Sequence, residues 1–241
     1  MSEEINKKFF DPSFHLLEKF RDMAPGTHKH CQNVANICES VAVELGLNTD
    51  LIKCAALYHD IGKMNNPKYF SENQGDSSNP HNDITPEMSY LIVTKHVGDS
   101  VLHLLDVEDM PRDVIKIVSQ HHGNSVLQAF FNKAKDDIED HFRYRCSKPK
   151  TTEASVLMIV DSVEAMARAL YNSKSDEEDA VSGFINKAIN GTIDRLVEDQ
   201  QLDSMQIGVL RTVKKILFKE LESTYHKRVS YESDSSKEKK E

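Results

Sequence analysis

The sequence predicts an all-α protein. Glycine and proline are scarce, with 9 and 7 among 241 residues. Runs of β-branched residues are few, whereas Glu, Lys, Leu and Ala, which favour helices, are abundant. A hydrophobic content of 39% is enough to build a sizeable core. Nothing in the middle of the chain has the composition of a linker, so we predict a single domain over 1–229 and a polar, disordered tail over 230–241.

Charge and composition exclude several classes of protein. The net charge of −9 argues against a duplex-DNA binder, which would have a basic face. No window approaches the roughly 18 apolar residues needed to cross a bilayer, and the polar N-terminus is no signal peptide. The four cysteines show no C-x-x-C pairing, so reduced thiols in a cytoplasmic protein are expected. They are Cys31, Cys38, Cys54 and Cys146.

Start and stop signals predict the helices of the first quarter of the chain. Asp11 is an expected N-cap with Pro12 at the first helical position. Thr27 is the expected cap of the next helix, which Gly46 ends. Asn48 caps a third helix that carries an apolar run. The expected segments are 12–23, 27–45 and 49–60.

Similar signals predict the remaining helices. Pro86 and Pro111 open two of them, and Thr152 begins a long apolar one. The expected segments are 86–105, 111–120, 126–135, 152–170, 177–190 and 203–225. Two polar stretches without periodicity, 64–84 and 142–150, separate helices. Loops of such length in a compact domain are often functional.

One group of histidines and aspartates lies in apolar segments or at helix ends. His59 and Asp60 follow an apolar helix, where imidazole and carboxylate can bind one cation and the carboxylate can bridge to a second. Asp161 lies inside an apolar helix. Burying an unpaired carboxylate costs several kcal/mol or more, so we expect Asp161 to have a cation beside it. The whole group is His30, His59, Asp60, His96, His121, His122 and Asp161.

This group suits a pair of first-row divalent ions, because it holds imidazoles and carboxylates but no thiolate. Taken one at a time, each member also has a structural explanation. A half-buried helix histidine, a histidine at a helix C-terminus and a surface acid are common. The residues alone therefore leave a metal site and a purely structural role both open.

The order His…His-Asp…His…His-His…Asp resembles that of the HD-domain metal-dependent phosphohydrolases, whose name comes from the pair found here as His59-Asp60. The resemblance covers about residues 25–172 and is most specific to the cytoplasmic HD domain of the seven-transmembrane cyclic di-AMP phosphodiesterases. The motifs that carry it are Pro25-Gly26-Thr27 with His30, His59-Asp60-Ile61-Gly62-Lys63, Glu72-Asn73-Gln74, Asn79-Pro80-His81, His96-Val97, Gln120-His121-His122-Gly123, Phe142-Arg143-Tyr144, Lys148-Pro149 and Asp161-Ser162-Val163-Glu164-Ala165.

The resemblance implies an HD-domain helical bundle with a dinuclear metal site in its core. Iron or manganese would be bound, and cyclic di-AMP would be hydrolysed to the linear dinucleotide. One ion would be held by His30, His59, Asp60 and Asp161. The other would be held by His96, His121 and His122, with Asp60 bridging.

Two further roles are expected at the site. Asp60 and Lys63 are the expected catalytic residues, because Lys63 is placed to contact a phosphate oxygen as a point charge. The two polar loops are expected to recognise the dinucleotide, although their residues could instead stabilise turns. The expected substrate-binding residues are Asn73, Gln74, Asn79, His81, Arg143, Tyr144 and Lys148.

The chain departs from this branch of the family in two respects. The membrane and extracellular portions are absent, which indicates a free-standing soluble enzyme or an excised catalytic domain. Arg145-Cys146-Ser147 stands where the family usually has a Pro-Gly turn, so the base preference is open.

Other functions remain as alternatives. HD oxygenases use mixed-valence di-iron with six protein ligands, and a seventh here favours hydrolysis. A nucleotide sensor without catalysis would be expected to lack ligands, and none is missing. A single-metal nucleoside phosphohydrolase would leave three histidines unexplained. The sequence leaves open the metal, since zinc also tolerates these ligands. It also leaves open oligomer formation through 203–225.

Overall fold

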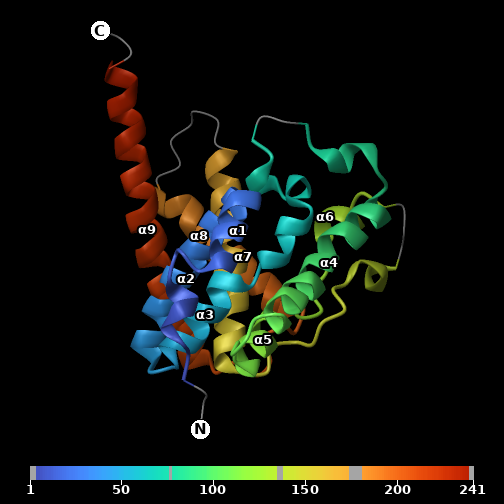
Figure 1. Cartoon of the computed structure of the whole chain (residues 1–241). Helices are drawn as coiled ribbons and strands as arrows, with labels where there is room; N and C mark the ends of the chain where they lie inside the picture. Colours follow the sequence, from blue (N-terminus) through green and yellow to red (C-terminus); the bar gives the residue numbers. More distant parts are fainter. Residues whose placement is uncertain (1–3, 76–77, 135–137, 174–180, 239–241) are drawn as a thin grey trace.

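The computed structural model describes residues 4–75, 78–134, 138–173 and 181–238, with side chains as far as His226. Its α-helices are α1 (His15–Met23), α2 (Pro25–Leu45), α3 (Thr49–Tyr58), α4 (Pro86–Leu105), α5 (Arg112–Val118), α6 (Gln128–Phe131), α7 (Thr152–Asn172), α8 (Val181–Glu198) and α9 (Ile207–Glu238), shown in Figure 1. Within these ranges there is no strand, only an isolated bridge between Val126 and Arg143. The all-α prediction is confirmed.

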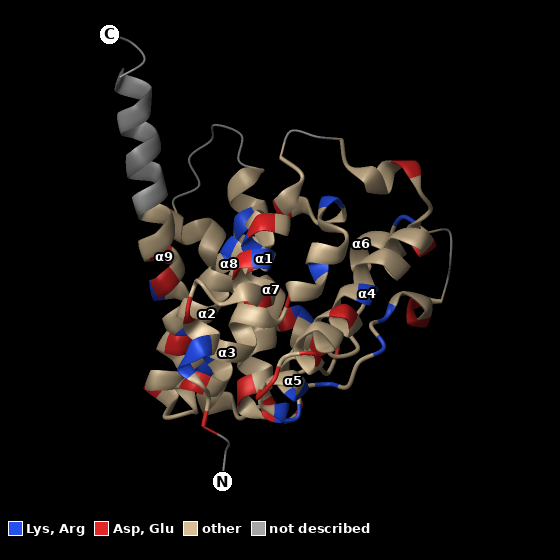
Figure 2. Cartoon of the chain, in the orientation of Figure 1, with Lys and Arg blue, Asp and Glu red and all other residues tan. Residues whose placement is uncertain are grey.

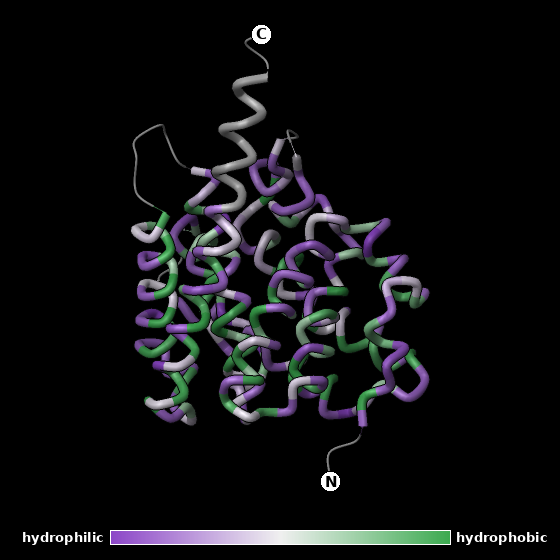
Figure 3. Tube along the Cα trace, turned by 90° about the vertical axis from the view of Figure 1, so that its left-hand side faces the viewer, coloured by the Kyte–Doolittle hydropathy of each residue, from purple (hydrophilic) through white to green (hydrophobic). Residues whose placement is uncertain are grey.

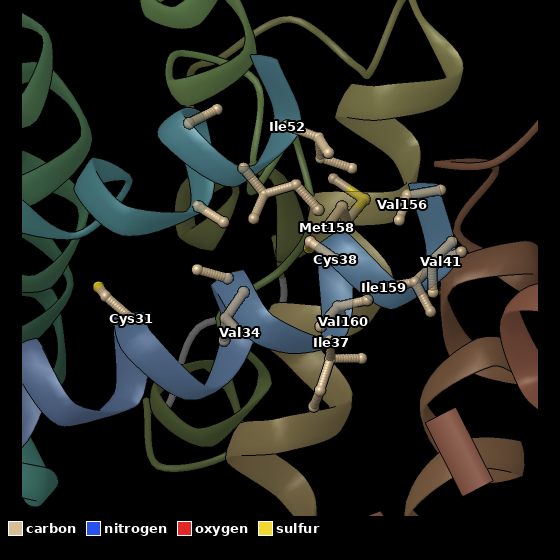
Figure 4. Close-up of a cluster of buried hydrophobic side chains, with 14 of the residues drawn as sticks. Cys31, Val34, Ile37, Cys38, Val41, Ile52, Val156, Met158, Ile159 and Val160 are labelled. Atoms are coloured by element: carbon tan, nitrogen blue, oxygen red, sulfur yellow. The ribbon is translucent and has the colours of Figure 1, made fainter. Parts of the chain in front are cut away.

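Helices α2, α3 and α7 form the centre of the bundle. From Ala154 to Asp161 every residue of α7 is buried, so this part of the helix is enclosed on all sides. Figure 4 shows Val34 of α2, Ile52 of α3 and Met158 of α7 packed together. Each large apolar side chain buried in this way stabilises the fold by about 1.5–3 kcal/mol.

The other helices lie on two sides of this centre. Helix α8 packs against α7 and α9, and α9 also packs against α2. Helix α5 contacts α3, α4 and α7. Apolar and polar residues alternate along the helices (Figure 3), as expected where one face is buried. Acidic and basic residues are interspersed over the helices in the view of Figure 2.

Capping explains several helix boundaries. The Asn48 side chain accepts a hydrogen bond from the backbone N–H of Leu51, so this predicted N-cap is confirmed, and Thr85 caps α4 in the same way by accepting from Met88. Gly46 ends α2 with φ of 65°, a left-handed conformation that glycine adopts without strain.

Two predicted helix starts near the N-terminus are wrong. Asp11 accepts hydrogen bonds from the backbone and hydroxyl of Ser13, which forms a turn, and α1 begins only at His15. Thr27 is not a cap either, because α2 begins at Pro25 and the Thr27 side chain bonds to another segment. A local pattern can place a cap too early or too late when a long-range partner competes for the same side chain.

The last helix differs from both of its predicted bounds, 203 and 225, and it begins only at Ile207. Helix α9 continues to Glu238, so the backbone of 230–238 is helical rather than disordered. No glycine or proline follows Gly208, and therefore nothing in the sequence interrupts the helix. Residues 239–241 and 174–180, which include the predicted start of a helix at 177, lie outside the described residues. The single-domain boundary at 229 stays a prediction.

Across the described ranges, no helix combines the length and the hydropathy required to pass through a bilayer.

Candidate metal centre

The turn after α3 places the His-Asp pair at the centre of the molecule. His59 and Asp60 are 0% and 1% exposed. The short 3₁₀ helix η2 (Ile61–Asn65) follows and packs against α4. Gly62 permits this contact, because a Cβ there would lie 2.2 Å from the His96 carbonyl oxygen. The Gly62 N–H donates to Ser100 Oγ over 2.9 Å. The absence of a side chain at 62 thus brings α4, and His96 with it, up to Asp60.

One group of possible ligands comes from α2, the α3 end and α7. His30 Nε2 lies 2.9 Å from Asp161 Oδ1. His59 Nε2 lies 3.4 Å from Asp60 Oδ2 and 3.5 Å from Asp161 Oδ1. These four residues are buried and each offers one ligand atom within a sphere small enough for a single ion. We call them the acidic half of the centre.

A second group comes from α4 and the segment after α5. His96 Nε2 and His121 Nε2 lie 3.2 Å and 3.7 Å from Asp60 Oδ1. His122 completes the group, and its Nδ1 is 3.8 Å from Asp161 Oδ2. We call His96, His121 and His122 the imidazole half. The two oxygens of Asp60 face different halves, so this carboxylate lies between them.

The hydrogen bonds of the ring nitrogens indicate that a cation belongs here. Nδ1 of His59, His96 and His121 each faces the carbonyl oxygen three residues earlier, at 2.8, 2.5 and 2.6 Å. Each Nδ1 must therefore donate, which leaves Nε2 of the neutral ring as an acceptor. Two such acceptors, on His96 and His121, are 3.2 Å apart. Facing lone pairs repel unless a positive charge lies between them.

Two further atoms support the same conclusion. His59 Nε2 and Asp60 Oδ1 are buried without a hydrogen-bond partner among the described residues. Burying such atoms without a partner is costly, whereas coordination to an ion would satisfy both. The donor set of imidazole and carboxylate therefore fits divalent ions.

The two halves differ in their electrostatics. Burial opposes a charge on His30, but the carboxylates of Glu164 and Asp161 outweigh it and raise the pKa of His30 to about 10. In the imidazole half, burial lowers the pKa of His121, and burial together with His121 lowers the pKa of His122 well below 6.5. Burial also opposes the charge of Asp60, yet Lys63 and His59 hold its pKa well below the ordinary range.

A cavity of about 790 Å³ opens onto both halves. His30 and Asp161 line it from the acidic half, and His96 and His122 from the imidazole half. The volume is in the range of small-molecule sites. Lys63 also lines the cavity, with Nζ 2.7 Å from Asp60 Oδ2 and 3.1 Å from Glu72 Oε1.

The first polar loop is used mainly for internal contacts. Asn73 Nδ2 donates to Thr27 Oγ1 over 2.7 Å. Gln74 donates to the Lys68 carbonyl, and Asn79 caps the backbone N–H of His81. His81 bonds to the Tyr69 carbonyl and lines a different, smaller cavity. None of Asn73, Gln74, Asn79 and His81 lines the cavity above the two halves.

The second polar loop divides between the cavity and the outer surface. Tyr144 lines the cavity, with its ring centroid 4.4 Å from that of His122. Arg143 is paired with Asp199 at 2.7 Å and with Glu139, and Lys148 donates to the Gln200 carbonyl. Arg143 and Lys148 line a separate hollow of about 310 Å³. The structure therefore brings Tyr144, but not Arg143 or Lys148, to the centre.

Two acids that support the site, Glu164 and Glu72, had no role at the site in the prediction from the sequence. Glu164 Oε2 lies 2.5 Å from His30 Nδ1 and so orients that ring. Its signal was available, because Glu164 is one helical turn after Asp161 on the same face. Glu72, which contacts Lys63, is nine residues further along the chain and had no periodic signal.

Comparison with known proteins identifies the class. The family model described as HD domain matches residues 27–166, so the chain belongs to the HD-domain family. The cyclic-di-AMP phosphodiesterase PgpH of Bacillus subtilis is 34% identical over 233 residues, which are 94% of this chain and 32% of that protein. PgpH of Listeria monocytogenes is 36% identical over 230 residues, 93% of this chain and 31% of that protein. The chain thus spans about one third of the length of these relatives.

Solved structures give the same result for the fold. The crystal structure of the HD domain of L. monocytogenes PgpH has a TM-score of 0.80 and 37% identity to this chain. The match covers 88% of this chain and 99% of the crystallised one. A second structure of that domain, in complex with cyclic-di-AMP, also has a TM-score of 0.80, with 35% identity. The HD-type helical bundle predicted from the sequence is confirmed.

Proposed function

We propose that this domain is a divalent-metal-dependent phosphodiesterase that hydrolyses a cyclic dinucleotide, with cyclic di-AMP as the first substrate to test. One observation carries the proposal: Asp60 lies between two groups of possible ligands, and members of both groups line one cavity. The relatives support it, since proteins named cyclic-di-AMP phosphodiesterase match nearly the whole chain, and a similar domain has been crystallised with cyclic-di-AMP.

The proposed ligands follow the two halves. The acidic half would hold one ion and the imidazole half the other, with Asp60 shared. When bound, a pair of divalent ions supplies a nucleophile at neutral pH and neutralises charge on the phosphate oxygens. We propose iron or manganese, the ions that the family resemblance implies, and the nitrogen and oxygen donors fit either of them. Cys31 is the thiol beside the centre, but it faces His59 Nδ1, on the side of the ring away from Asp60.

The protein groups contribute orientation and charge. The carbonyl bonds to Nδ1 hold the imidazole rings of His59, His96 and His121 in fixed directions, so little reorganisation accompanies binding. Lys63 is the cation of the cavity wall nearest to Asp60 and would contact a non-bridging phosphate oxygen. Phe70 and Tyr144 line the same cavity and would limit the access of water.

We propose Tyr144 as a substrate contact, because its ring forms part of the cavity wall beside His122. Aromatic rings commonly stack on nucleobases. The other expected substrate residues already have protein partners. Direct contact with the dinucleotide would require each of them to exchange that partner, which makes Tyr144 the first of the seven to test.

The test is a panel of cyclic dinucleotides incubated with the protein reloaded with manganese or ferrous iron, with products separated by chromatography. We expect the linear dinucleotide from cyclic di-AMP and about two metal ions per chain, one for each half. Turnover coupled to oxygen consumption would instead indicate an oxygenase. Binding without any product would indicate a sensor, and either result would contradict the proposal.

A further inference from the structure

Glu72 is a buried acid that lies beside Lys63 in the cavity wall. Its side chain is 6% exposed. Its Oε1 accepts hydrogen bonds from Lys63 Nζ over 3.1 Å and from Thr27 Oγ1 over 3.0 Å. The ring of Phe70 lies 4.9 Å from the same ammonium. Two residues of one short segment, 70–73, thus contact Lys63.

The position of this segment is set by the backbone of α2. A Cβ at Gly26 would lie 1.8 Å from the Glu72 carbonyl oxygen, so only glycine allows the two segments this close. The Asn73 side chain accepts from the Thr27 N–H at 3.1 Å and donates to the Thr27 hydroxyl. Glu72 therefore has little freedom to follow Lys63 if that side chain moves. It is Lys63 that must adapt to Glu72.

The donors of Lys63 are only partly used. An ammonium has three N–H groups, and here one faces Asp60 and one faces Glu72. The third remains for a ligand in the cavity, which Lys63 and Glu72 both line. A lysine on its flexible four-carbon chain can rotate about a single carboxylate, whereas two carboxylates fix the direction of the remaining N–H.

Glu72 also contacts a second cation. Its Oε2 lies 3.9 Å from Arg168 Nη2 of α7, and Arg168 lines the same cavity. One carboxylate therefore links a lysine of η2 with an arginine on the wall formed by α7.

From this geometry we infer that Glu72 is a positioning residue, which holds the Lys63 ammonium at Asp60 with one donor directed to the substrate phosphate. The inference rests on the proposed function, in which Lys63 contacts a phosphate oxygen. Glu72 acts through Lys63 and does not itself touch the reacting atoms.

The test is a double-mutant cycle of Glu72→Gln and Lys63→Met on the full, metal-loaded chain. Glutamine keeps the shape and can still accept from Thr27, but it removes the negative charge. We expect kcat for cyclic di-AMP to fall about tenfold in Glu72→Gln, with melting temperature and bound metal unchanged. In the Lys63→Met background the same substitution should change kcat by less than about twofold, because its target is gone.

Glu39→Gln is the matched control, since Glu39 forms a 2.7 Å pair with Lys53 on the outside of the bundle. It should leave kcat unchanged. If Glu72→Gln does not fold, Glu72→Asp, which keeps the charge but is one methylene shorter, takes its place in the cycle with the same expected non-additivity. The inference would be overturned if the double variant lost kcat by the product of the two single losses, or if Glu72→Gln kept the kcat of the wild type.

A second substrate separates this inference from the proposed function. Bis(p-nitrophenyl) phosphate is a simple diester without nucleobases. If the wild-type chain cleaves it but no cyclic dinucleotide, the proposed substrate is wrong, and the cycle measured with the simple diester still decides the role of Glu72.

Discussion

The two halves of the centre use the same residue type in opposite electrostatic settings. In the acidic half, His30 and His59 face Asp161, Asp60 and, through Nδ1 of His30, Glu164. In the imidazole half, His96 and His121 face the same oxygen of Asp60, His122 faces Asp161, and the three rings lie against one another. The pKa of His30 and His59 is raised despite burial, whereas the pKa of His121 and His122 is lowered by it. Burial opposes the charge of all four rings; it is outweighed by carboxylates at His30 and by Cys31 with carboxylates at His59, but it prevails at His121 and His122.

This difference teaches how each half would accept an ion. A histidine must be neutral to bind a metal. In the imidazole half, the lowered pKa of His121 and His122 keeps both rings neutral at pH 7, and they release no proton on binding. Those of the acidic half must give up a proton, but their carboxylates then contribute full negative charge to the ion. The acidic half should therefore bind an ion with the steeper pH dependence.

The largest effect is expected from the residue that the two halves share. Asp60→Asn should reduce bound metal in both halves and lower kcat by more than about 100-fold, since even supporting residues of metal ligands typically cost 10–100-fold. Elemental analysis and turnover of the reloaded variant measure this. A variant that keeps two ions per chain would contradict the position of Asp60 between the halves.

Substitution of a residue that is not itself a ligand should weaken metal binding in one half only. Glu164→Gln removes the carboxylate that orients His30 Nδ1 while leaving the imidazole half untouched. Metal affinity of one site should fall about 10–100-fold, and the other site should be unaffected. A two-site titration with manganese tests this. Equal weakening of both sites would show that the halves are not independent.

The free energy of unfolding of the metal-free protein should fall at both alkaline and acidic pH, and a different histidine should cause each loss. The folded pKa of His30, about 10, exceeds the ordinary 6.5, so its stabilisation is complete below pH 6.5 and is lost as the pH rises toward 10. For His122 the folded pKa is well below 6.5, and stability is lost as the pH falls below 6.5, because the unfolded chain takes up the proton first.

Thermal unfolding of the metal-free chain across this range measures both limbs. We expect a maximum near neutral pH, a flatter alkaline limb in His30→Asn and a flatter acidic limb in His122→Asn. If each substitution flattened the opposite limb, the electrostatic difference between the halves would be wrong.

The smallest effect is expected outside the cavity. Arg143→Ala removes a side chain that is already paired with Asp199 and Glu139, so KM should change by less than about threefold. Tyr144→Ala, which opens the cavity wall beside His122, should raise KM more. The ratio of the two KM values, measured with metal content as a check, decides which side of the second loop meets substrate.

The sequence was informative where the responsible interactions are local. Asn48 and Thr85 cap helices through bonds to residues three positions on, and such signals are visible in the sequence itself. Asp161 was identifiable because a carboxylate within an apolar helix has few explanations. The HD motif then placed the remaining ligands in an order that a bundle could bring together.

What the sequence could not supply are the contacts between distant segments. Glu72 lies 45 residues from Thr27, and Glu164 lies 134 residues from His30. No periodicity encodes such pairs, because the first depends on how segment 70–73 packs against α2 and the second on how α7 packs against α2. The same reason explains Arg143, whose acidic partner Asp199 directly follows the end of α8. In the sequence, the polar residues of the second loop had the same predicted role, and only the packing of the helices shows which line the cavity and which lie on the outer surface.

The contact of Gly62 with α4 has a mechanical consequence. A Cβ at position 62 would lie only 2.2 Å from the His96 carbonyl oxygen. Any side chain there would therefore push α4, which carries His96, away from Asp60. Each half could still assemble from its own helices, yet Asp60 would no longer span the gap. The spacing between the two halves therefore depends on the close approach of Gly62 to α4, and position 62 cannot take a larger residue without changing that spacing.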